Sequence, residues 1–350
     1  MNEENKVVEL HSTNGRIQSL LNLGIHLHIN RTNRGDFLRS SLYNLVQIMR
    51  NHPIFKGRVK YDSFSGQILF DDMDGKESRL EDHHISEIRY TAEDRWSVSF
   101  KDKDVWSAID IVSRENQVNP LHDYLRDLRG LWTPKKGSES RAAKLLSLIG
   151  AEDNPLHRAY SRRWMLACVS RAYATLENRV KADYLLLLYG KQRIGKSTAL
   201  REVAFSEQFG DRYFGDTALR IDDYRETVQK MQGKLIYELQ EFAGRPRDPQ
   251  YEKSFFSMQK DESRAVYRRS YTIVPRRTTF AVTTNRKDVL RDSTGSSRFW
   301  CVDCGVQKID LPKLREELPY MWSETLHVYD MYHKAAKELK RRNKIKEMKK

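Results

Sequence analysis

Residues 190–197 have the residue types and spacing of a phosphate-binding loop. The segment reads GKQRIGKS, which satisfies the pattern G-x-x-x-x-G-K-[ST], and it follows an apolar run and precedes a stretch expected to be helical. Glycines let the backbone approach a phosphate without Cβ clashes, and N–H groups at the helix start face the anion. Lys196 is expected to reach the β and γ phosphates, and Ser197 to ligate Mg²⁺. The pattern predicts an ATP-Mg²⁺ site contacted by Gly190, Arg193, Ile194, Gly195, Lys196, Ser197 and Thr198.

Two glutamates stand at the end of the next apolar strand. The run KLIYEL at 234–239 places Glu238 near its end, and Glu241 follows one turn later. A carboxylate at the C-terminal end of such a strand lies beside the phosphates, where Glu238 is expected to join the Mg²⁺ shell. Another carboxylate could polarise the attacking water. Acidic residues at strand ends are also commonly solvated, and the spacing leaves the catalytic carboxylate open between Glu238 and Glu241.

An amide and several arginines follow the later strands. The run 278–284 leads directly into Asn285, whose amide could orient the attacking water, the role called sensor 1 in AAA+ ATPases. Ordinary turn chemistry is the alternative for this asparagine. Arg298 precedes an aromatic strand start, where a guanidinium could project into a neighbouring subunit's ATP site as an arginine finger. Arg286 and Arg291 compete for that role, and a structural arginine is the alternative for each.

The elements that must position these residues alternate between strand and helix. Apolar strands are expected in the runs ADYLLLLYG, GKLIYEL, RRTTFAVTTN and RFWCVDC, with a helix from Lys196, and the alternation predicts an α/β fold with a parallel sheet. Short apolar segments around Ser65 and Gly66 predict a hairpin within a smaller, mixed α+β unit. We therefore expect an N-terminal α+β domain at 1–132, a linker at 133–140, an ATPase domain at 141–333 and a basic tail at 334–350.

The positive charge is concentrated at the C-terminal end of the chain. The 350 residues carry 62 Lys and Arg against 48 Asp and Glu, for a net charge of +14. Residues 334–350 contain nine Lys and Arg and two Glu, which is half of that net charge. Such a block could bind a polyanion by releasing condensed counterions, or it could be a solvated terminus. Both interpretations stay open from composition.

Cysteine usage and the N-terminal residues favour a reducing compartment. Three cysteines cannot form a disulfide framework, and reduced thiols fit the cytoplasm better than an exported protein. No apolar leader follows Met1, and no run approaches the ~20 apolar residues of a membrane helix. Cys301 and Cys304 form a C-x-x-C pair, but no second ligand pair follows it, so we interpret them as strand thiols and not as a zinc site.

The order of these motifs resembles the virulence-associated E protein family. The segments GKQRIGKS, GKLIYELQE, KSFFSMQKDESRAVYRR, VTTN and LRDSTGSSRFW carry the resemblance, which extends more loosely over 51–302. That family comprises phage- and island-encoded relatives of superfamily 3 helicases within the AAA+ class. The resemblance implies an AAA+ type P-loop ATPase fold, a ring that is expected to be a hexamer, and work in the cytoplasm of a bacterial host. DNA and other replication proteins are the implied partners.

The resemblance also assigns roles at the matching positions. It implies that Lys196 and Ser197 are the nucleotide and Mg²⁺ ligands, that Glu238 and Glu241 are the acidic pair, that Asn285 is the sensor and that Arg298 is the finger. This sequence departs from the family pattern at two places. Leu239 and Gln240 stand between Glu238 and Glu241, whereas many relatives have two adjacent acidic residues. Ser297 stands where relatives commonly have a second arginine. The segment 253–271 corresponds to a pore-facing hairpin, with a solvated hairpin as the alternative. Its candidate DNA contacts are Lys253, Lys260, Arg264, Arg268 and Arg269.

Two functions of different classes are consistent with these features. The first is an ATP-hydrolysing, ring-forming DNA helicase or translocase of phage or mobile-element replication. The second is an ATP-switched DNA-binding initiator or scaffold that does not unwind processively. Both use the same phosphate-binding loop, and the first 130 residues contain no convincing primase constellation.

Overall fold

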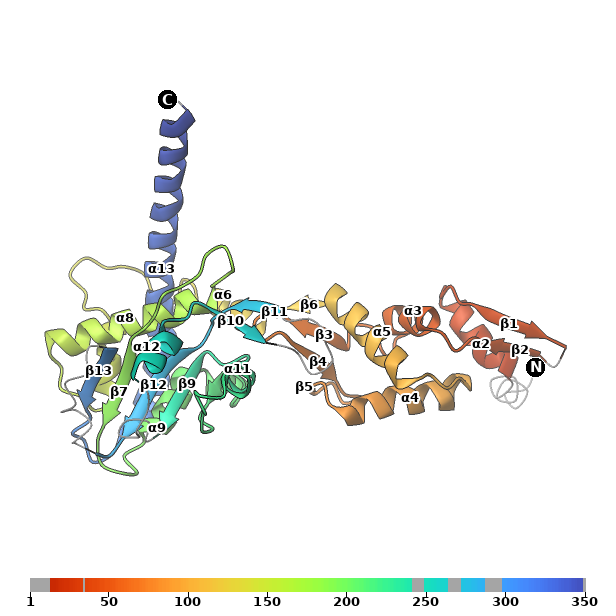
Figure 1. The fold of residues 1–350 in the computed structure, drawn as a ribbon, viewed down its shortest axis with the longest axis horizontal. Coiled ribbons are helices and arrows are strands. Elements are labelled where there is room, and N and C mark those ends of the chain that lie inside the picture. The colour runs from red at the N-terminus through yellow and green to blue at the C-terminus, as the bar shows by residue number, and fades with distance from the viewer. Residues whose placement is uncertain (1–12, 34, 241–248, 264–271, 287–297, 349–350) are drawn as a thin grey trace. The chain divides into compact units, whose positions relative to one another are not determined.

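The computed structural model describes residues 13–33, 35–240, 249–263, 272–286 and 298–348 (Figure 1). By contacts, the chain divides into two compact units, Met1–Pro120 and Leu121–Lys350. Among the described residues, no helix is both long and apolar enough to cross a membrane.

The first unit mixes helices with a four-stranded sheet of order β5-β4-β3-β6. Strands β3 and β4 form the antiparallel hairpin expected around Ser65 and Gly66, with Asp62 paired to Gln67 across the turn. A separate antiparallel pair, β1 and β2, lies outside this sheet. The elements are α2 (Thr13–Asn22), β1 (Ile29–Thr32), β2 (Gly35–Leu38), α3 (Leu42–Asn51), β3 (Val59–Asp62), β4 (Gln67–Asp71), β5 (Glu77–Arg79), α4 (Asp82–Trp96), α5 (Asp102–Glu115) and β6 (Gln117–Val118).

Helices α3 and α5 supply much of the core of the first unit. Helix α3 begins after Ser41, whose side chain accepts a hydrogen bond from the Asn44 N–H, an N-cap that satisfies an otherwise unpaired donor. Its apolar residues recur at helical spacing, so that Leu45, Ile48 and Met49 are fully buried.

The second unit is built on a five-stranded parallel sheet, which confirms the predicted mixed α/β architecture with a parallel sheet. Its strands are β7 (Leu185–Tyr189), β8 (Phe214–Gly215), β9 (Ile236–Gln240), β12 (Thr279–Thr284) and β13 (Phe299–Asp303), in the spatial order β13-β7-β12-β9-β8. The central strands are buried along almost their whole length, as expected where helices cover both faces of a parallel sheet. The apolar residues of these strands therefore follow from the layer architecture.

The other elements of the second unit surround or extend from this sheet. They are α6 (Pro120–Asp127), η1 (Ala142–Lys144), α7 (Leu145–Leu148), α8 (Pro155–Ala172), α9 (Lys196–Val203), α10 (Ser206–Phe209), α11 (Tyr224–Met231), α12 (Pro249–Ser257), β10 (Lys260–Ser263), β11 (Thr272–Pro275) and α13 (Leu311–Met348). Strands β10 and β11 pair antiparallel as a hairpin apart from the main sheet.

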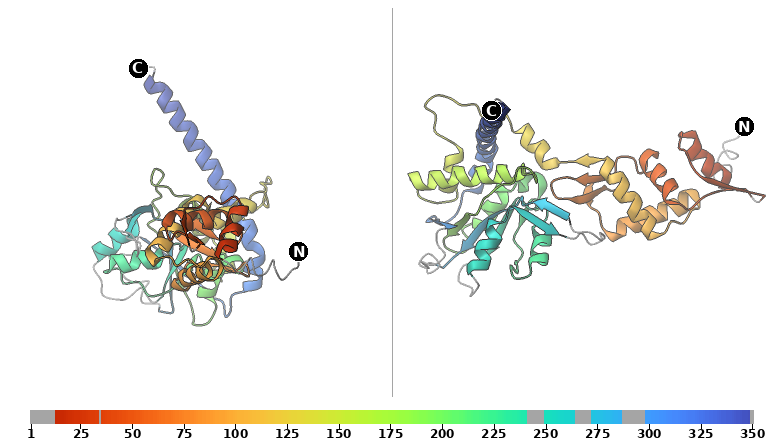
Figure 2. Two further views of the ribbon diagram at one scale, coloured as in Figure 1. Left: turned by 90° about the vertical axis from the view of Figure 1, so that its right-hand side faces the viewer. Right: turned by 45° about the horizontal axis from the view of Figure 1, so that its top comes forward.

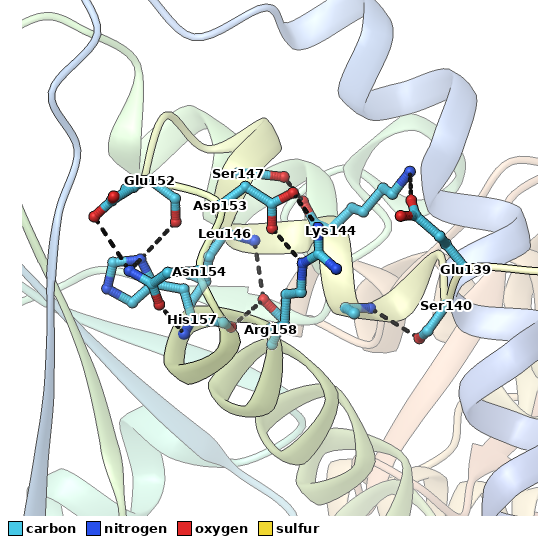
Figure 3. Close-up of polar contacts among 12 residues, drawn as sticks. Glu139, Ser140, Lys144, Leu146, Ser147, Glu152, Asp153, Asn154, His157 and Arg158 are labelled. Carbon is cyan, nitrogen blue, oxygen red and sulfur yellow. Dashed lines mark hydrogen bonds and ion pairs between the residues drawn. The ribbon is translucent and has the colours of Figure 1, made fainter.

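Helix α8 shows how local sequence starts an element of this unit. The Asn154 side chain accepts a 2.9 Å hydrogen bond from the His157 N–H, and Pro155 occupies the first helical turn, where its missing N–H costs nothing (Figure 3). Arg158 pairs with Asp153 just before the helix at 2.6 Å. Further along, Trp164 donates to the Phe280 carbonyl at 3.3 Å, which fixes α8 on the sheet.

The contact division falls at Pro120, before the domain end expected at 132. The reason is that residues 121–132 pack on the second unit: His122 hydrogen bonds the Ala172 carbonyl at 2.9 Å, and Arg129 pairs with Asp330 at 2.9 Å. The expected linker, 133–140, contains neither helix nor strand and is almost wholly exposed.

The expected basic tail is continuous with helix α13. The helix runs from Leu311 to Met348, so the segment 334–348 has helical backbone. In both views of Figure 2 its C-terminal part extends away from the parallel sheet. Exposed Met331, Tyr332 and Leu339 lie along that part of the helix.

Candidate nucleotide-binding site

The loop 190–195 joins the end of β7 to the start of α9. Its first residue, Gly190, donates from its N–H to the Thr284 carbonyl at 3.2 Å, which ties the loop to the tip of β12. A Cβ at this position would lie 2.9 Å from both the Cys304 carbonyl oxygen and Ile194 Cδ1, so packing requires glycine here. Gly195 adopts φ +103° as the residue before α9, a left-handed conformation that glycine accommodates without strain. The structure thus explains why the pattern has glycine at positions 190 and 195.

Lys196 and Ile194 hold the loop closed. The Lys196 ammonium donates to the carbonyls of Gly190 at 2.8 Å and Lys191 at 2.9 Å, so its charge lies over the loop. Ile194 is buried, and its carbonyl accepts a 2.8 Å hydrogen bond from the Ile309 N–H. Arg193 and Thr198 are exposed beside it, with Arg193 at φ +62°. The loop thus carries a cation that is hydrogen bonded to its own backbone, and the buried Ile194 anchors that backbone.

Ser197, directly after Lys196, is hydrogen bonded to Glu238 of β9. The Ser197 hydroxyl donates to Glu238 Oε1 at 2.6 Å, and the Thr283 hydroxyl donates to the same oxygen. Glu238 is only 1% exposed, and Gln240 Nε2 lies 3.5 Å from its second oxygen. A carboxylate and a hydroxyl are hard oxygen ligands of the kind Mg²⁺ takes in phosphate-binding sites. The Ser197 and Glu238 side chains therefore fit the metal that the sequence predicts.

Thr283 and Gln240 are site residues that sequence reasoning missed. They are direct partners in the register between β12 and β9, and both contact Glu238. The signal was the threonine-rich end of the run RRTTFAVTTN, because two polar residues finishing a buried strand must face something polar.

Asn285 lies at the same edge of the sheet as the loop. Thr284 pairs with Tyr189, the residue before Gly190, so Asn285 follows directly at the strand tip and is exposed there. Strand β12 lies between β7 and β9, which places Asn285 between the loop and the strand of Glu238. The structure thus brings Lys196, Ser197, Glu238 and Asn285 to one edge.

Arg298 lies at the opposite edge of the sheet. It precedes Phe299, which pairs with Leu185 at the start of β7, whereas Asp303 pairs with Tyr189 at the loop. Four residue steps of strand separate the two ends, roughly 13 Å. The Arg298 guanidinium donates to the Ser257 hydroxyl at 2.7 Å, at the end of α12. The structure therefore does not place Arg298 in the nucleotide site of its own chain.

The hairpin of β10 and β11 is anchored by a buried ion pair. Arg276 is fully buried, and its Nε lies 3.0 and 3.1 Å from the two carboxylate oxygens of Asp261. The same guanidinium donates to the Phe255 carbonyl and stacks 4.5 Å from the Phe255 ring. This clamp joins α12 to the base of the hairpin. Sequence reasoning gave Arg276 no role, although a charged pair before an apolar strand marks a possible buried cation.

Two of the five expected DNA contacts lie among the described residues. Lys260 is exposed at the first position of β10, and the backbone of Lys253 is helical in α12. Arg264, Arg268 and Arg269 lie outside the described residues, as do Glu241 and Arg291.

Of the C-x-x-C pair, Cys301 lies within β13, and Cys304 follows the strand directly and forms a β-bridge with Ala151. Burial raises the pKa of the Cys304 thiol to about 12, so the thiol carries its proton at neutral pH. All three cysteines are free, and the described residues contain no group of three His, Cys, Asp or Glu side chains that could hold a metal.

The fold and site define a mixed α/β protein whose parallel sheet presents a phosphate-binding loop sequence at the end of one strand. The model of the virulence-associated protein E-like domain matches residues 131–350, and the chain belongs to this family. The family resemblance drawn from the motifs is thereby confirmed.

Solved structures of the NrS-1 C-terminal region are similar to this chain at low identity. "The A form apo structure of NrS-1 C terminal region-CTR" matches with 10% identity and a TM-score of 0.43, over 76% of this chain and 65% of that chain. "The A form apo structure of NrS-1 C terminal region-CTR(305-718)" matches with 11% identity and a TM-score of 0.42, over 76% and 64%. This chain therefore spans less than two thirds of their length. No curated protein matches the chain.

Proposed function

We propose that this protein is an ATP-hydrolysing DNA translocase of the AAA+ type, acting as a superfamily 3 helicase in phage or mobile-element replication. The observation that carries the proposal is the hydrogen bond between Ser197, at the end of the phosphate-binding loop, and the buried carboxylate of Glu238. A carboxylate held at the serine of a phosphate-binding loop could share Mg²⁺ with that serine, as phosphoryl transfer requires.

The strand order supports the AAA+ assignment. Numbered along the chain, the strands lie in the order fifth, first, fourth, third, second, with the loop strand β7 next to β12. This order leaves one strand, β12, between the loop strand β7 and the acidic strand β9, so Asn285, which follows the last residue of β12, lies between the two. An uncharged amide in that place can orient a water toward the γ-phosphate.

The residues of the loop fit ATP. The Lys196 ammonium, now on two loop carbonyls, can turn to the β and γ phosphates, and the N-terminus of α9 offers N–H groups to an anion. Ser197 and Glu238 would hold Mg²⁺, which supplies charge neutralisation on the phosphate oxygens when bound. Glu238 or Glu241 would accept the proton of the attacking water, and Asn285 would orient that water.

The position of Arg298 supports action between subunits. Because it lies at the sheet edge opposite its own loop, its guanidinium could reach a γ-phosphate only in a neighbouring chain. We propose that the active form is a ring, expected to be a hexamer, in which each ATP is shared between two subunits. DNA would contact the β10–β11 hairpin, where exposed Lys260 begins the first strand.

The test compares ATP hydrolysis and fork unwinding in three proteins. Lys196→Ala should lose DNA-stimulated hydrolysis and strand displacement, whereas Lys191→Ala, which alters an exposed lysine of the same loop, should retain both. Binding of forked DNA by the native protein without ATP-dependent strand displacement would instead favour the initiator or scaffold function. Phosphate transfer to a metabolite would exclude both.

A further inference from the structure

The β1–β2 hairpin of the first unit has one buried and one exposed face. Ile29 pairs with Leu38 on the inner face, where Leu38 joins the core and Ile29 packs against it. Side chains alternate along a strand, so the neighbouring pair, Asn30 and Phe37, points outward. Figure 1 shows the hairpin as a two-stranded ribbon beside α2.

Among the described residues of the hairpin and the first turn of α3, the outward-facing side chains include aromatic rings and no carboxylate. Phe37 is 43% exposed, and Tyr43, in the first turn of α3, is 41% exposed. The Tyr43 ring stacks on the exposed His28 ring with centroids 4.2 Å apart and planes 12° apart. We define the hairpin face as His28, Asn30, Thr32, Phe37, Arg39 and Tyr43.

A buried asparagine fixes the backbone beneath this face. The Asn44 side chain is fully buried, accepts from the His28 N–H at 2.7 Å and donates to the His28 carbonyl at 2.8 Å. Its amide also donates to the Arg39 carbonyl at 2.8 Å. Asn44 therefore fixes the backbones of His28 and Arg39 next to Tyr43. A ligand on this face would have to order little additional backbone.

We propose that the hairpin face is a binding site for single-stranded DNA, separate from the β10–β11 hairpin. Bases stack on exposed aromatic rings whatever their sequence, and cationic side chains follow the phosphates. Phe37 and the stacked pair of Tyr43 and His28 provide two platforms, and exposed Arg39 provides the cation. Single-stranded DNA fits better than duplex DNA because its bases are free to stack on the rings. It fits better than an apolar protein surface because asparagine, threonine and arginine share the face.

The test measures binding of a short fluorescent oligothymidylate to the full chain by anisotropy, without ATP. Phe37→Ala and Tyr43→Ala should each weaken binding about tenfold, since stacking contributes at this level per base. Phe37→Tyr and Tyr43→Phe keep a ring and should restore native affinity. Tyr90→Ala is the control, because Tyr90 is 71% exposed elsewhere in the same unit.

A second readout locates the contact. Oligonucleotides carrying 5-iodouracil should crosslink to Phe37 or Tyr43 on irradiation, and peptide mapping would identify the residue. The Lys196→Ala protein should show the same crosslink, so this site is tested independently of ATP hydrolysis. Unchanged affinity in the double variant Phe37→Ala/Tyr43→Ala would overturn the proposal. An altered sedimentation coefficient with unchanged DNA affinity would assign the face to a second copy of the chain instead.

Discussion

The Ser197 hydroxyl and the Glu238 carboxylate are joined by a 2.6 Å hydrogen bond, although 41 residues separate them along the chain. The bond connects the first turn of α9 with the end of β9. Helix α9 follows β7, and β12 lies between β7 and β9 in the sheet. Thr283 of β12 donates to the same carboxylate oxygen. Helix α9 and the strands β9 and β12 therefore all contribute to the position of one buried carboxylate.

Glu238→Gln should abolish ATP hydrolysis while ATP binding is retained. Glutamine has nearly the same shape and can still accept from Ser197, but it cannot accept a proton or neutralise a cation. General-base and charge effects of this kind contribute about 10²-fold or more to the rate. Steady-state phosphate release measures the loss, and equilibrium binding of a fluorescent ATP analogue measures the affinity.

Glu207→Gln is the matched control for that experiment. Glu207 is exposed in α10, so the same chemical change there should leave hydrolysis unaltered. If Glu238→Gln retains hydrolysis, Glu241 and not Glu238 would be assigned as the catalytic carboxylate.

The Arg276–Asp261 pair should contribute strongly to folding stability. Arg276→Met leaves the Asp261 carboxylate buried without its partner, and breaking such pairs typically costs about 3–5 kcal/mol. The double variant Arg276→Met/Asp261→Leu removes both charges and should recover much of that loss. Chemical denaturation monitored by tryptophan fluorescence measures each free energy of unfolding.

Asp153→Ala is the contrasting variant. It breaks the surface ion pair with Arg158 of α8, and should change stability much less than Arg276→Met does (Figure 3). Equal effects at the two sites would show that burial does not determine the contribution of the Arg276 pair.

The second unit should lose stability as the pH falls from about 6.5. Burial lowers the pKa of His122 in the folded state, although its hydrogen bond to the Ala172 carbonyl opposes the shift. The unfolded chain then binds more protons than the folded one below the ordinary histidine pKa, so protonation favours unfolding. The contribution is fully present above the unfolded pKa and is lost as the pH falls toward the folded one.

Thermal unfolding between pH 5 and 8 of the native chain and of His122→Gln checks this expectation. Glutamine can still donate to the Ala172 carbonyl but does not titrate, so the variant should show a shallower decline of the melting temperature on acidification. Parallel pH profiles would assign the decline to other groups.

The sheet was predictable because its central strands β7 and β12 contain the apolar runs 185–188 and 280–282. Such runs are typical of parallel strands that are covered on both faces. The loop was also predictable, since its whole pattern lies in one continuous segment, in which Gly195 has the positive φ that favours glycine. The contacts of Thr283 and Gln240 with Glu238 depend on the register between β12 and β9, which no local pattern specifies. The unit boundary at Pro120 likewise depends on where His122 packs, a tertiary contact.

Arg298→Ala should inhibit native subunits when the two proteins are mixed. If the guanidinium acts on a neighbour's ATP, each variant subunit leaves the ATP site of a native neighbour without its arginine. Hydrolysis should then fall more steeply than the fraction of native protein. Ser257→Ala removes the 2.7 Å hydrogen bond of Arg298 within the chain but leaves the guanidinium, so this control should stay largely active and give no inhibition on mixing. Arg286→Ala, at the loop edge of the sheet, tests the competing finger. A loss that is proportional to the fraction of Arg298→Ala would contradict action between subunits, because independent chains simply average.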